Sequence, residues 1–175
     1  MIIVKSLYFM LPAYLANMTP SLLRKTRFLS APVDFGKKWK RKRILGNHKT
    51  WRGIIVAPLV GIIVALIQQL LFPYLKVISL IDYSQGAWLL GLLLGGGAII
   101  GDLVKSFFKR RLSIRSGKPW PILDQIDFVV GALLFAYIVY IPPFAYVLAV
   151  IIISPLLHVI SNLIGYCLKI QKNKW

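Results

Sequence analysis

Residues 86–111 read GAWLLGLLLGGGAIIGDLVKSFFKRR. The first part, 86–105, is almost wholly apolar and has roughly the 20 residues that an α-helix needs to cross the hydrocarbon core of a bilayer. The stretch also carries Asp102 and Lys105 and ends on Lys109, Arg110 and Arg111. It therefore predicts a transmembrane helix whose last turns meet water at a strongly charged boundary.

Four further apolar stretches have similar lengths, at 2–23, 53–73, 125–141 and 143–168. Hydrophobic residues make up 58% of the chain, and the mean hydropathy is +0.72. A soluble domain of this size would expose large apolar patches at such values. We therefore expect an all-α integral membrane protein of one domain, 1–175, with five transmembrane helices and basic cytosolic loops at 24–52 and 106–124.

Charge is concentrated between these stretches. The chain has 22 Lys and Arg but five Asp and no Glu, and its net charge is +17. Twenty of the basic residues lie in 24–52, 105–118 and 169–174, beside apolar segments. Because short cytosolic loops are rich in Lys and Arg, this distribution indicates membrane orientation rather than nucleic-acid binding. It predicts a multi-pass protein of the cell membrane with its N-terminus outside and its C-terminus in the cytosol.

Glycine spacing marks the predicted helix at 86–105. Gly91 and Gly95, and again Gly97 and Gly101, are four residues apart. Small residues at this spacing let two helices approach closely in lipid. The glycines do not form a nucleotide P-loop, because their spacing to Lys105 does not match that motif.

Three carboxylates lie at the cytosolic ends of predicted spans: Asp102, Asp124 and Asp127. A carboxylate beside hydrocarbon is costly unless a cation pairs with it. Asp124 and Asp127 are three residues apart and would share one helix face. Oxygen ligands without a His or Cys cluster are typical of a hard divalent cation such as Mg²⁺. The residues therefore predict a site for one or two metal ions at the membrane boundary.

A structural interpretation of the same carboxylates stays open. Asp124 can cap the helix that follows, and Asp127 can interact with the dipole of that helix. Asp102 can pair with Lys105 or Lys109 on its own helix. Capping, however, explains one carboxylate better than it explains three.

Two basic groups accompany the carboxylates. The loop before 53–73 reads RILGNHKTWRG from Arg43 to Gly53, and its cations and the next helix N-terminus can bind phosphate. The same run can equally be a positive-inside flank or a contact with anionic lipid, with Thr50 as an N-cap. In the second group, positions 102, 105, 106 and 109 share one side of a helix, so a carboxylate, a hydroxyl and two cations converge there.

At these residues the sequence resembles the archaeal CDP-archaeol synthase family and, more distantly, the CDP-diglyceride synthases (phosphatidate cytidylyltransferases). The resemblance rests on LGNHKTWRG (45–53), on Gly101-Asp102 with SFFKRR (106–111), and on DQIDF (124–128). The wider signature S-x-x-K-R followed by D-R-x-D is matched except that Gln125 replaces the arginine. The Lys-Asp and His-Gly-Gly elements of the bacterial enzymes are missing, which favours the archaeal ether-lipid branch.

The resemblance implies Mg²⁺-dependent transfer of CMP from CTP to an unsaturated archaetidic acid, 2,3-bis-O-geranylgeranylglycerol 1-phosphate, with release of pyrophosphate. The implied partners are CTP, a lipid phosphate with isoprenoid chains and the membrane lipids, with no nucleic acid; a homodimer is left open. The expected catalytic residues, of which the three aspartates bind the metal, are Asp102, Asp124, Asp127, Lys109 and Arg110. The expected substrate-binding residues, for the CTP phosphates and the lipid headgroup, are Arg43, Asn47, Lys49, Thr50, Arg52, Lys105, Ser106 and Arg111.

Two other functional classes remain as alternatives. One is a transporter or channel for a phosphate-bearing solute, although the repeated halves common in transporters are not visible in the sequence. The other is a non-catalytic tether to anionic lipids, which would not need the aspartates. Incubation with labelled CTP and lipid phosphate, with and without a chelator, distinguishes these classes from an enzyme.

Overall fold

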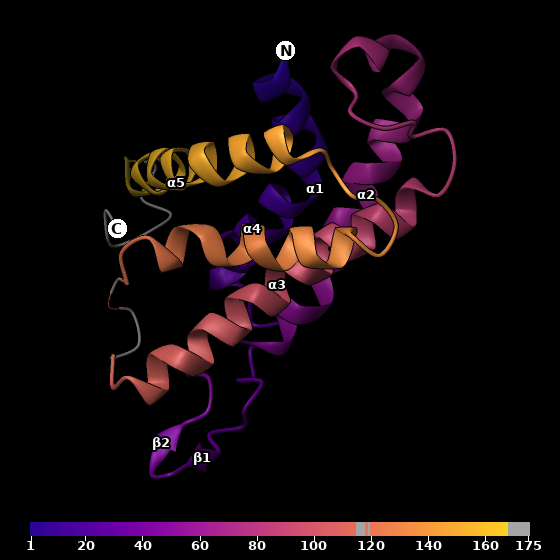
Figure 1. The fold of residues 1–175 in the computed structure, drawn as a ribbon. Coiled ribbons are helices and arrows are strands. Elements are labelled where there is room, and N and C mark those ends of the chain that lie inside the picture. Colours follow the sequence, from indigo (N-terminus) through magenta and orange to yellow (C-terminus); the bar gives the residue numbers. More distant parts are fainter. Residues whose placement is uncertain (115–117, 119, 168–175) are drawn as a thin grey trace.

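The computed structural model describes residues 1–114, 118 and 120–167 (Figure 1). The helices in these residues are α1 (Ile2–Leu22), α2 (Trp51–Leu75), α3 (Ala87–Arg111), α4 (Leu123–Ala136) and α5 (Phe144–Cys167). Short 3-10 turns follow α1 at Leu23–Lys25 and α2 at Lys76–Ile78. The prediction of a mainly helical chain is confirmed. The basic C-terminal segment 169–174 lies outside the described residues.

Three helices in the described part of the chain are long and apolar enough to cross a membrane. They are Ile2–Leu22, Ala87–Arg111, and α2 together with the turn after it, Trp51–Ile78. In α5 the stretch Phe144–Leu157 is also apolar. Many large apolar side chains on the outer faces of these helices are exposed, as expected for surfaces that contact lipid.

The fourth helix differs from the predicted span at 125–141. It begins at Leu123 and ends at Ala136, and its 14 residues cover roughly 21 Å, less than the ~30 Å hydrocarbon core. The N–H groups of Ile138 and Val139 donate to carbonyls three residues back. The helix therefore tightens and ends ahead of the proline pair at 142–143, which cannot donate backbone hydrogen bonds.

Glycines bring α3 against both of its neighbours, α2 and α4. A Cβ added to Gly91 would clash with the carbonyl oxygen of Gly61 on α2, and one added to Gly97 would clash with that of Gly131 on α4. An added Cβ at Gly101 would likewise strike the backbone of α4. The close approach predicted from the glycine spacing is confirmed, and α3 is the central helix of the bundle.

A small hairpin lies in the loop between α1 and α2. Strands β1 (Lys38–Trp39) and β2 (Lys42–Arg43) pair antiparallel. The two residues between them, Lys40 and Arg41, have φ values of 51° and 64°. Positive φ at both central residues of a two-residue loop is the geometry of a type I′ turn.

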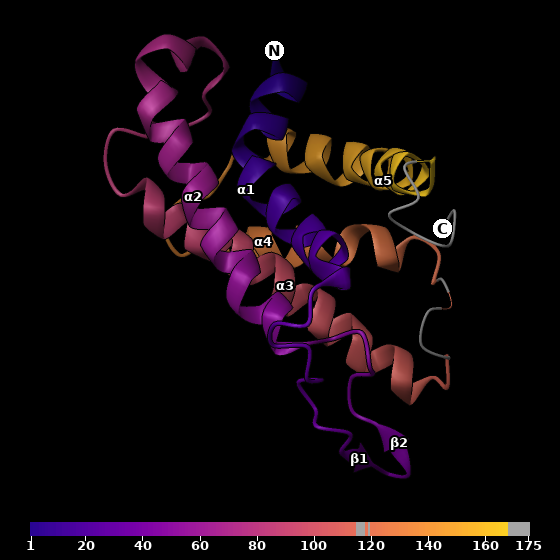
Figure 2. The same cartoon turned by 180° about the vertical axis from the view of Figure 1, so that it is seen from behind.

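Charged segments gather at one end of the bundle. Figures 1 and 2 both show the hairpin, the start of α2, the end of α3 and the start of α4 toward this end. The connections 76–86 and 137–143 lie toward the opposite end (Figure 1). The described parts of the basic loops between helices are therefore brought together, as the alternation of apolar and basic segments predicts.

Candidate functional site

The three predicted carboxylates meet around one ammonium group. Lys105 Nζ lies 3.0 Å from Asp102 Oδ1, 3.1 Å from Asp124 Oδ1 and 2.8 Å from Asp127 Oδ2. Asp102 and Lys105 come from α3, and the other two carboxylates come from α4. The sequence prediction that these acids lie together is confirmed, but a lysine stands at their centre.

Two further lysines complete this group. Lys49, just before α2, forms an ion pair with Asp102. Lys109 donates to both carboxylate oxygens of Asp124, at 3.0 and 2.9 Å, and to the Lys118 carbonyl at 2.7 Å. Three carboxylates thus face three ammonium groups. We call the following residues the carboxylate–lysine cluster: Lys49, Asp102, Lys105, Lys109, Asp124 and Asp127.

Local sequence explains how the cluster forms. The face of α3 that carries Asp102, Lys105 and Lys109 turns toward α4, because the missing side chain of Gly101 lets the Asp127 backbone come into contact. Asp124 occupies the first turn of α4 and accepts a hydrogen bond from the Trp120 N–H at 2.6 Å. Asp124 therefore has a local structural bond in addition to its two lysines.

The cluster is mostly shielded from water. The side chains of Asp102, Asp124 and Asp127 are 17%, 22% and 6% exposed, and that of Lys105 is 13% exposed. Asp127 Oδ2 is buried and, despite its 2.8 Å ion-pair contact, accepts no hydrogen bond of good geometry from the described residues. Buried charges of this kind persist only when opposite charges compensate them.

The donor set suits a hard divalent cation. Carboxylate oxygens from three residues point at one position, and Asp127 Oδ2 has spare acceptor capacity. Within the described ranges, however, no three His, Cys or acidic side chains already stand as a ligand set for a metal. Lys105 Nζ occupies the point on which the oxygens converge.

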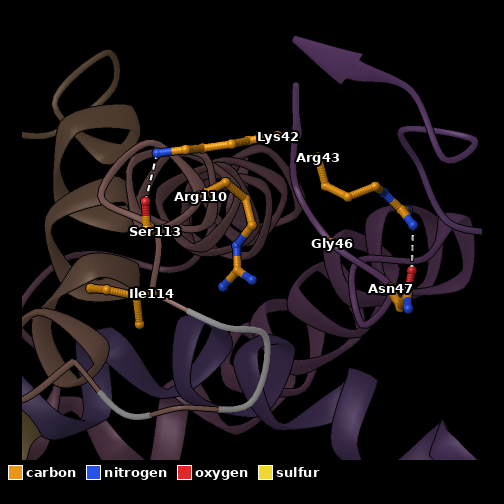
Figure 3. A pocket seen from close by; sticks show the side chains of 7 residues that line it. All are labelled: Lys42, Arg43, Gly46, Asn47, Arg110, Ser113 and Ile114. Atoms are coloured by element: carbon orange, nitrogen blue, oxygen red, sulfur yellow. Dashed lines mark hydrogen bonds between the residues drawn. The ribbon is translucent and has the colours of Figure 1, made fainter. Parts of the chain in front are cut away.

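A basic pocket opens beside the end of α3. Its volume is about 330 Å³, and Figure 3 shows the side chains around it. Arg110 extends between two hydrogen-bonded pairs, Lys42 with Ser113 at 2.6 Å and Arg43 with Asn47 at 2.6 Å. The Arg110 Nε is buried and has no partner among the described residues. We call this the basic pocket, lined by Lys42, Arg43, Gly46, Asn47, Arg110, Ser113 and Ile114.

A separate buried carboxylate, Asp34, organises the loop that forms one wall of the pocket. It accepts bonds from Arg43 at 2.5 and 3.2 Å and from the N–H groups of Gly36, Leu45 and Gly46 at 3.0 to 3.2 Å. We call Asp34 with these donors the Asp34 centre. The Arg43 guanidinium lowers the pKa of Asp34 well below its ordinary value; burial opposes this shift, and the three N–H groups reinforce it.

His48 lies in the same loop. Burial lowers the pKa of its imidazole, and the charges of Arg24, Lys49 and Arg110 lower it further. The imidazole is therefore less readily protonated than that of an exposed histidine and adds little positive charge to the surrounding cations.

Two of the predicted substrate-binding residues, Arg52 and Arg111, donate hydrogen bonds to protein backbone. Arg52 is buried and donates to Thr26 and to the Phe28 carbonyl, which fastens the start of the loop to α2. Arg111 donates to the carbonyls of the hairpin and lies 5.1 Å from the ring centres of Trp39 and Phe107. Both arginines hold the loop in place.

Two of the predicted substrate-binding residues, Thr50 and Ser106, carry hydroxyl groups. Thr50 is the N-cap residue of α2, but its side chain makes no capping hydrogen bond. Ser106 is buried on α3 between the positions of Lys105 and Lys109. Neither position by itself assigns the hydroxyl group to a ligand.

Sequence reasoning missed three residues of this end of the molecule. Lys42 and Ser113 line the basic pocket, and Asp34 holds its loop. Asp34 carried a signal, since it is the one acid among the basic residues of 24–52. Lys42 had none, because it stands in a run of similar cations.

The fold and this site define a membrane-embedded protein with three clustered carboxylates and a group of basic side chains at one end of an apolar helix bundle. A family model described as CarS-like, CDP-archaeol synthase, matches residues 1–175. The chain belongs to the CDP-archaeol synthase family, and the family resemblance stated from its motifs is confirmed.

Individual relatives match over nearly their whole length. The CDP-archaeol synthase of Pyrococcus furiosus is 39% identical over 174 residues, covering 99% of this chain and 98% of that protein. The one from Methanocaldococcus jannaschii is also 39% identical over 174 residues, with 97% and 96% coverage. A solved structure, described as an intramembrane enzyme for archaeal membrane lipids biosynthesis, matches with a TM-score of 0.74 and 30% identity over 90% of this chain and 92% of that one.

Proposed function

We propose that this chain transfers CMP from CTP to the phosphate of an unsaturated archaetidic acid and so forms CDP-archaeol. An oxygen of the lipid phosphate attacks the α-phosphorus of CTP, the bond from that phosphorus to the bridging oxygen breaks, and pyrophosphate leaves. The lipid phosphate is already ionised near neutral pH, so no general base is required. The observation that carries this proposal is that the carboxylate–lysine cluster and the basic pocket lie at the same end of an apolar bundle.

We propose Mg²⁺ as the metal, with Asp102, Asp124 and Asp127 as its ligands. Bound there, it would neutralise charge on the reacting phosphates and polarise the α-phosphate. The support is the hard-oxygen donor set and its convergence on one point. One or two ions are compatible with three carboxylates.

CTP is assigned to the basic pocket. The Nε of the Arg110 guanidinium makes no hydrogen bond to any described residue and can bind a phosphate oxygen. Asn47 and Arg43 present further polar groups to the pocket. The charges of Lys49, from the cluster, and Arg110, from the basic pocket, both act on the His48 imidazole, so the two groups of cations lie near each other. Phosphates that begin in the basic pocket can therefore extend to the lysines of the cluster, which stabilise the charge on the leaving pyrophosphate.

The lipid chains are assigned to an apolar groove between α1, α4 and α5. Its volume is about 300 Å³, and Phe128, which lines it, directly follows Asp127. A lipid in this groove would bring its headgroup to the cluster without leaving the membrane. The lining residues are Leu11, Tyr14, Leu15, Asn17, Met18, Phe128, Leu157, Ile160 and Ile164.

We propose five membrane crossings with the site in the cytosol and the N-terminus outside. The gathering of the basic loops at one end supports this orientation. In a Cys167→Ser background, a membrane-impermeant thiol reagent should label Lys37→Cys only from the cytosolic side and Ser84→Cys only from the outside. The reverse pattern would overturn the orientation.

The function itself is tested with purified protein in detergent. CTP labelled in its α-phosphate and the geranylgeranyl lipid phosphate should yield a labelled lipid and unlabelled pyrophosphate. The label should remain in water-soluble material when the lipid phosphate is left out. Failure to label the lipid at any divalent-metal concentration would contradict the proposed reaction.

A further inference from the structure

Lys105 holds a position that differs from those of the other lysines in the cluster. Among the described residues, it alone lies within ion-pair distance of all three carboxylates, at 2.8 to 3.1 Å. Lys49 pairs with Asp102, and Lys109 pairs with Asp124. Lys105 therefore occupies the centre, while the other two lysines are peripheral.

Three ionised carboxylates this close repel one another strongly unless a cation lies between them. Their oxygens all lie within 3.1 Å of one atom, and the side chains are largely buried, so mutual repulsion is weakly screened. The ammonium of lysine is a compact point charge on a flexible stem. Within the described part of the chain, Asp127 Oδ2 accepts no well-directed hydrogen bond, so its contact with this ammonium is chiefly that of two charges.

We propose that Lys105 is a built-in counter-ion that holds the three carboxylates together before metal binds, and that a divalent cation must displace its ammonium to reach them. This inference rests on the metal site of the proposed function. It reassigns Lys105, which the sequence indicated as a binder of substrate phosphate, to the metal ligands. Displacement would leave its charge free to turn toward phosphates near Lys109, one helical turn further along α3.

The test compares wild-type protein with Lys105→Met, which nearly keeps the length of the side chain and removes its charge. Thermal unfolding is measured in EDTA, and Mn²⁺ binding is measured by electron paramagnetic resonance of the free ion. In EDTA the variant should melt at a lower temperature than wild type, because three carboxylates lose their central cation. It should bind Mn²⁺ about tenfold or more tightly, since no ammonium competes, and Mn²⁺ should restore most of its lost stability.

Two further variants make the comparison specific. Lys37→Met removes one exposed charge from the same end of the molecule and should change neither measurement. Lys105→Gln keeps hydrogen-bond donors for the carboxylates, so it should remain folded in EDTA if Lys105→Met does not. It should also bind Mn²⁺ more tightly than wild type.

The possible negative results contradict either the counter-ion role of Lys105 or the metal of the proposed function. Folded Lys105 variants with unchanged or weaker Mn²⁺ affinity would overturn the counter-ion role, because the lysine would then not compete for the ligands. Unchanged melting of Lys105→Met in EDTA would overturn it as well. Absence of Mn²⁺ binding by wild type, even with CTP present, would instead remove the metal from the proposed function.

Discussion

The Asp34 centre and the carboxylate–lysine cluster are both buried charged groups at the same end of the molecule, yet they are built differently. Asp34 is a single carboxylate with one guanidinium and three backbone N–H donors. The cluster places three carboxylates around one ammonium, and no residue that the structure describes donates a well-directed hydrogen bond to Asp127 Oδ2. A carboxylate bound by backbone donors stabilises a loop, whereas several carboxylates that share lysines on flexible stems can accept a different cation.

Removal of divalent metal should separate the two centres most strongly. Excess EDTA should abolish CMP transfer, and added Mg²⁺ should restore it, because the cluster carboxylates then hold the ion. The Asp34 centre needs no metal, so hydrogen exchange of the Leu45 and Gly46 amides should be unchanged by EDTA. Full activity in excess EDTA would contradict a metal-binding role of the cluster in CMP transfer.

Gly101 tests the positioning of the cluster. Gly101→Ala should push α4 away from α3, since an added Cβ meets the Asp127 carbonyl. Overpacking of this kind lowers the free energy of unfolding by about 1–3 kcal/mol. Turnover should fall by more than this loss of stability alone would cause, because Asp127 moves. Gly96→Ala is the matched control, as nothing lies within 4 Å of its added Cβ. Equal activity in the two variants would show that this contact does not position the site.

Arg110 and Arg111 are adjacent on α3, but Arg110 lines the basic pocket and Arg111 donates to the backbone of the hairpin. Arg110→Ala should raise the KM for CTP about tenfold, the effect of one lost charge-assisted hydrogen bond, with little change in stability. Arg111→Ala should instead lower the melting temperature, because three carbonyls of the hairpin lose their donor. The measurements are steady-state kinetics and thermal unfolding. An unchanged KM in Arg110→Ala would exclude this arginine from CTP binding.

Acid should loosen the Asp34 centre only at low pH. The pKa of Asp34 is lowered in the folded protein, so its stabilising effect is complete above the ordinary value of 3.8 and is lost as pH falls through the folded-state pKa. Hydrogen exchange of the Leu45 and Gly46 amides, corrected for intrinsic rates, should stay slow at pH 5. It should become faster only as the pH falls below 3.8. Asp34→Asn should exchange faster at pH 6. Rapid exchange in wild type at pH 5 would contradict the assigned pKa direction.

Much of the fold follows from the sequence. Apolar length and basic flanks predicted the helices, and the spacing of Gly97 and Gly101 predicted a close helix contact that brings α3 against α4. The early end of α4 was not predicted, because hydropathy remains high through 137–141 while tight backbone bonds end the helix. Hydropathy measures transfer to lipid and carries no information on where the backbone turns.

The candidate site was predicted by residue type more than by arrangement. Helical spacing placed Asp102 and Lys105 on one face, but it could not show that Lys105 would reach both carboxylates of α4. Nor could a run of cations separate Arg110, which faces a pocket, from Arg111, which binds backbone. These distinctions depend on where a long side chain finds its partner in space.

The most direct test of a shared metal site is the turnover of Asp102→Asn, Asp124→Asn and the double variant, with melting temperatures measured alongside. If the carboxylates act as one unit, each single change should lower turnover about 10²-fold or more, and the double variant should be little worse than either single. All three should melt close to wild type in Mg²⁺. Near-normal turnover in either single variant, or losses that simply multiply in the double, would contradict a shared site.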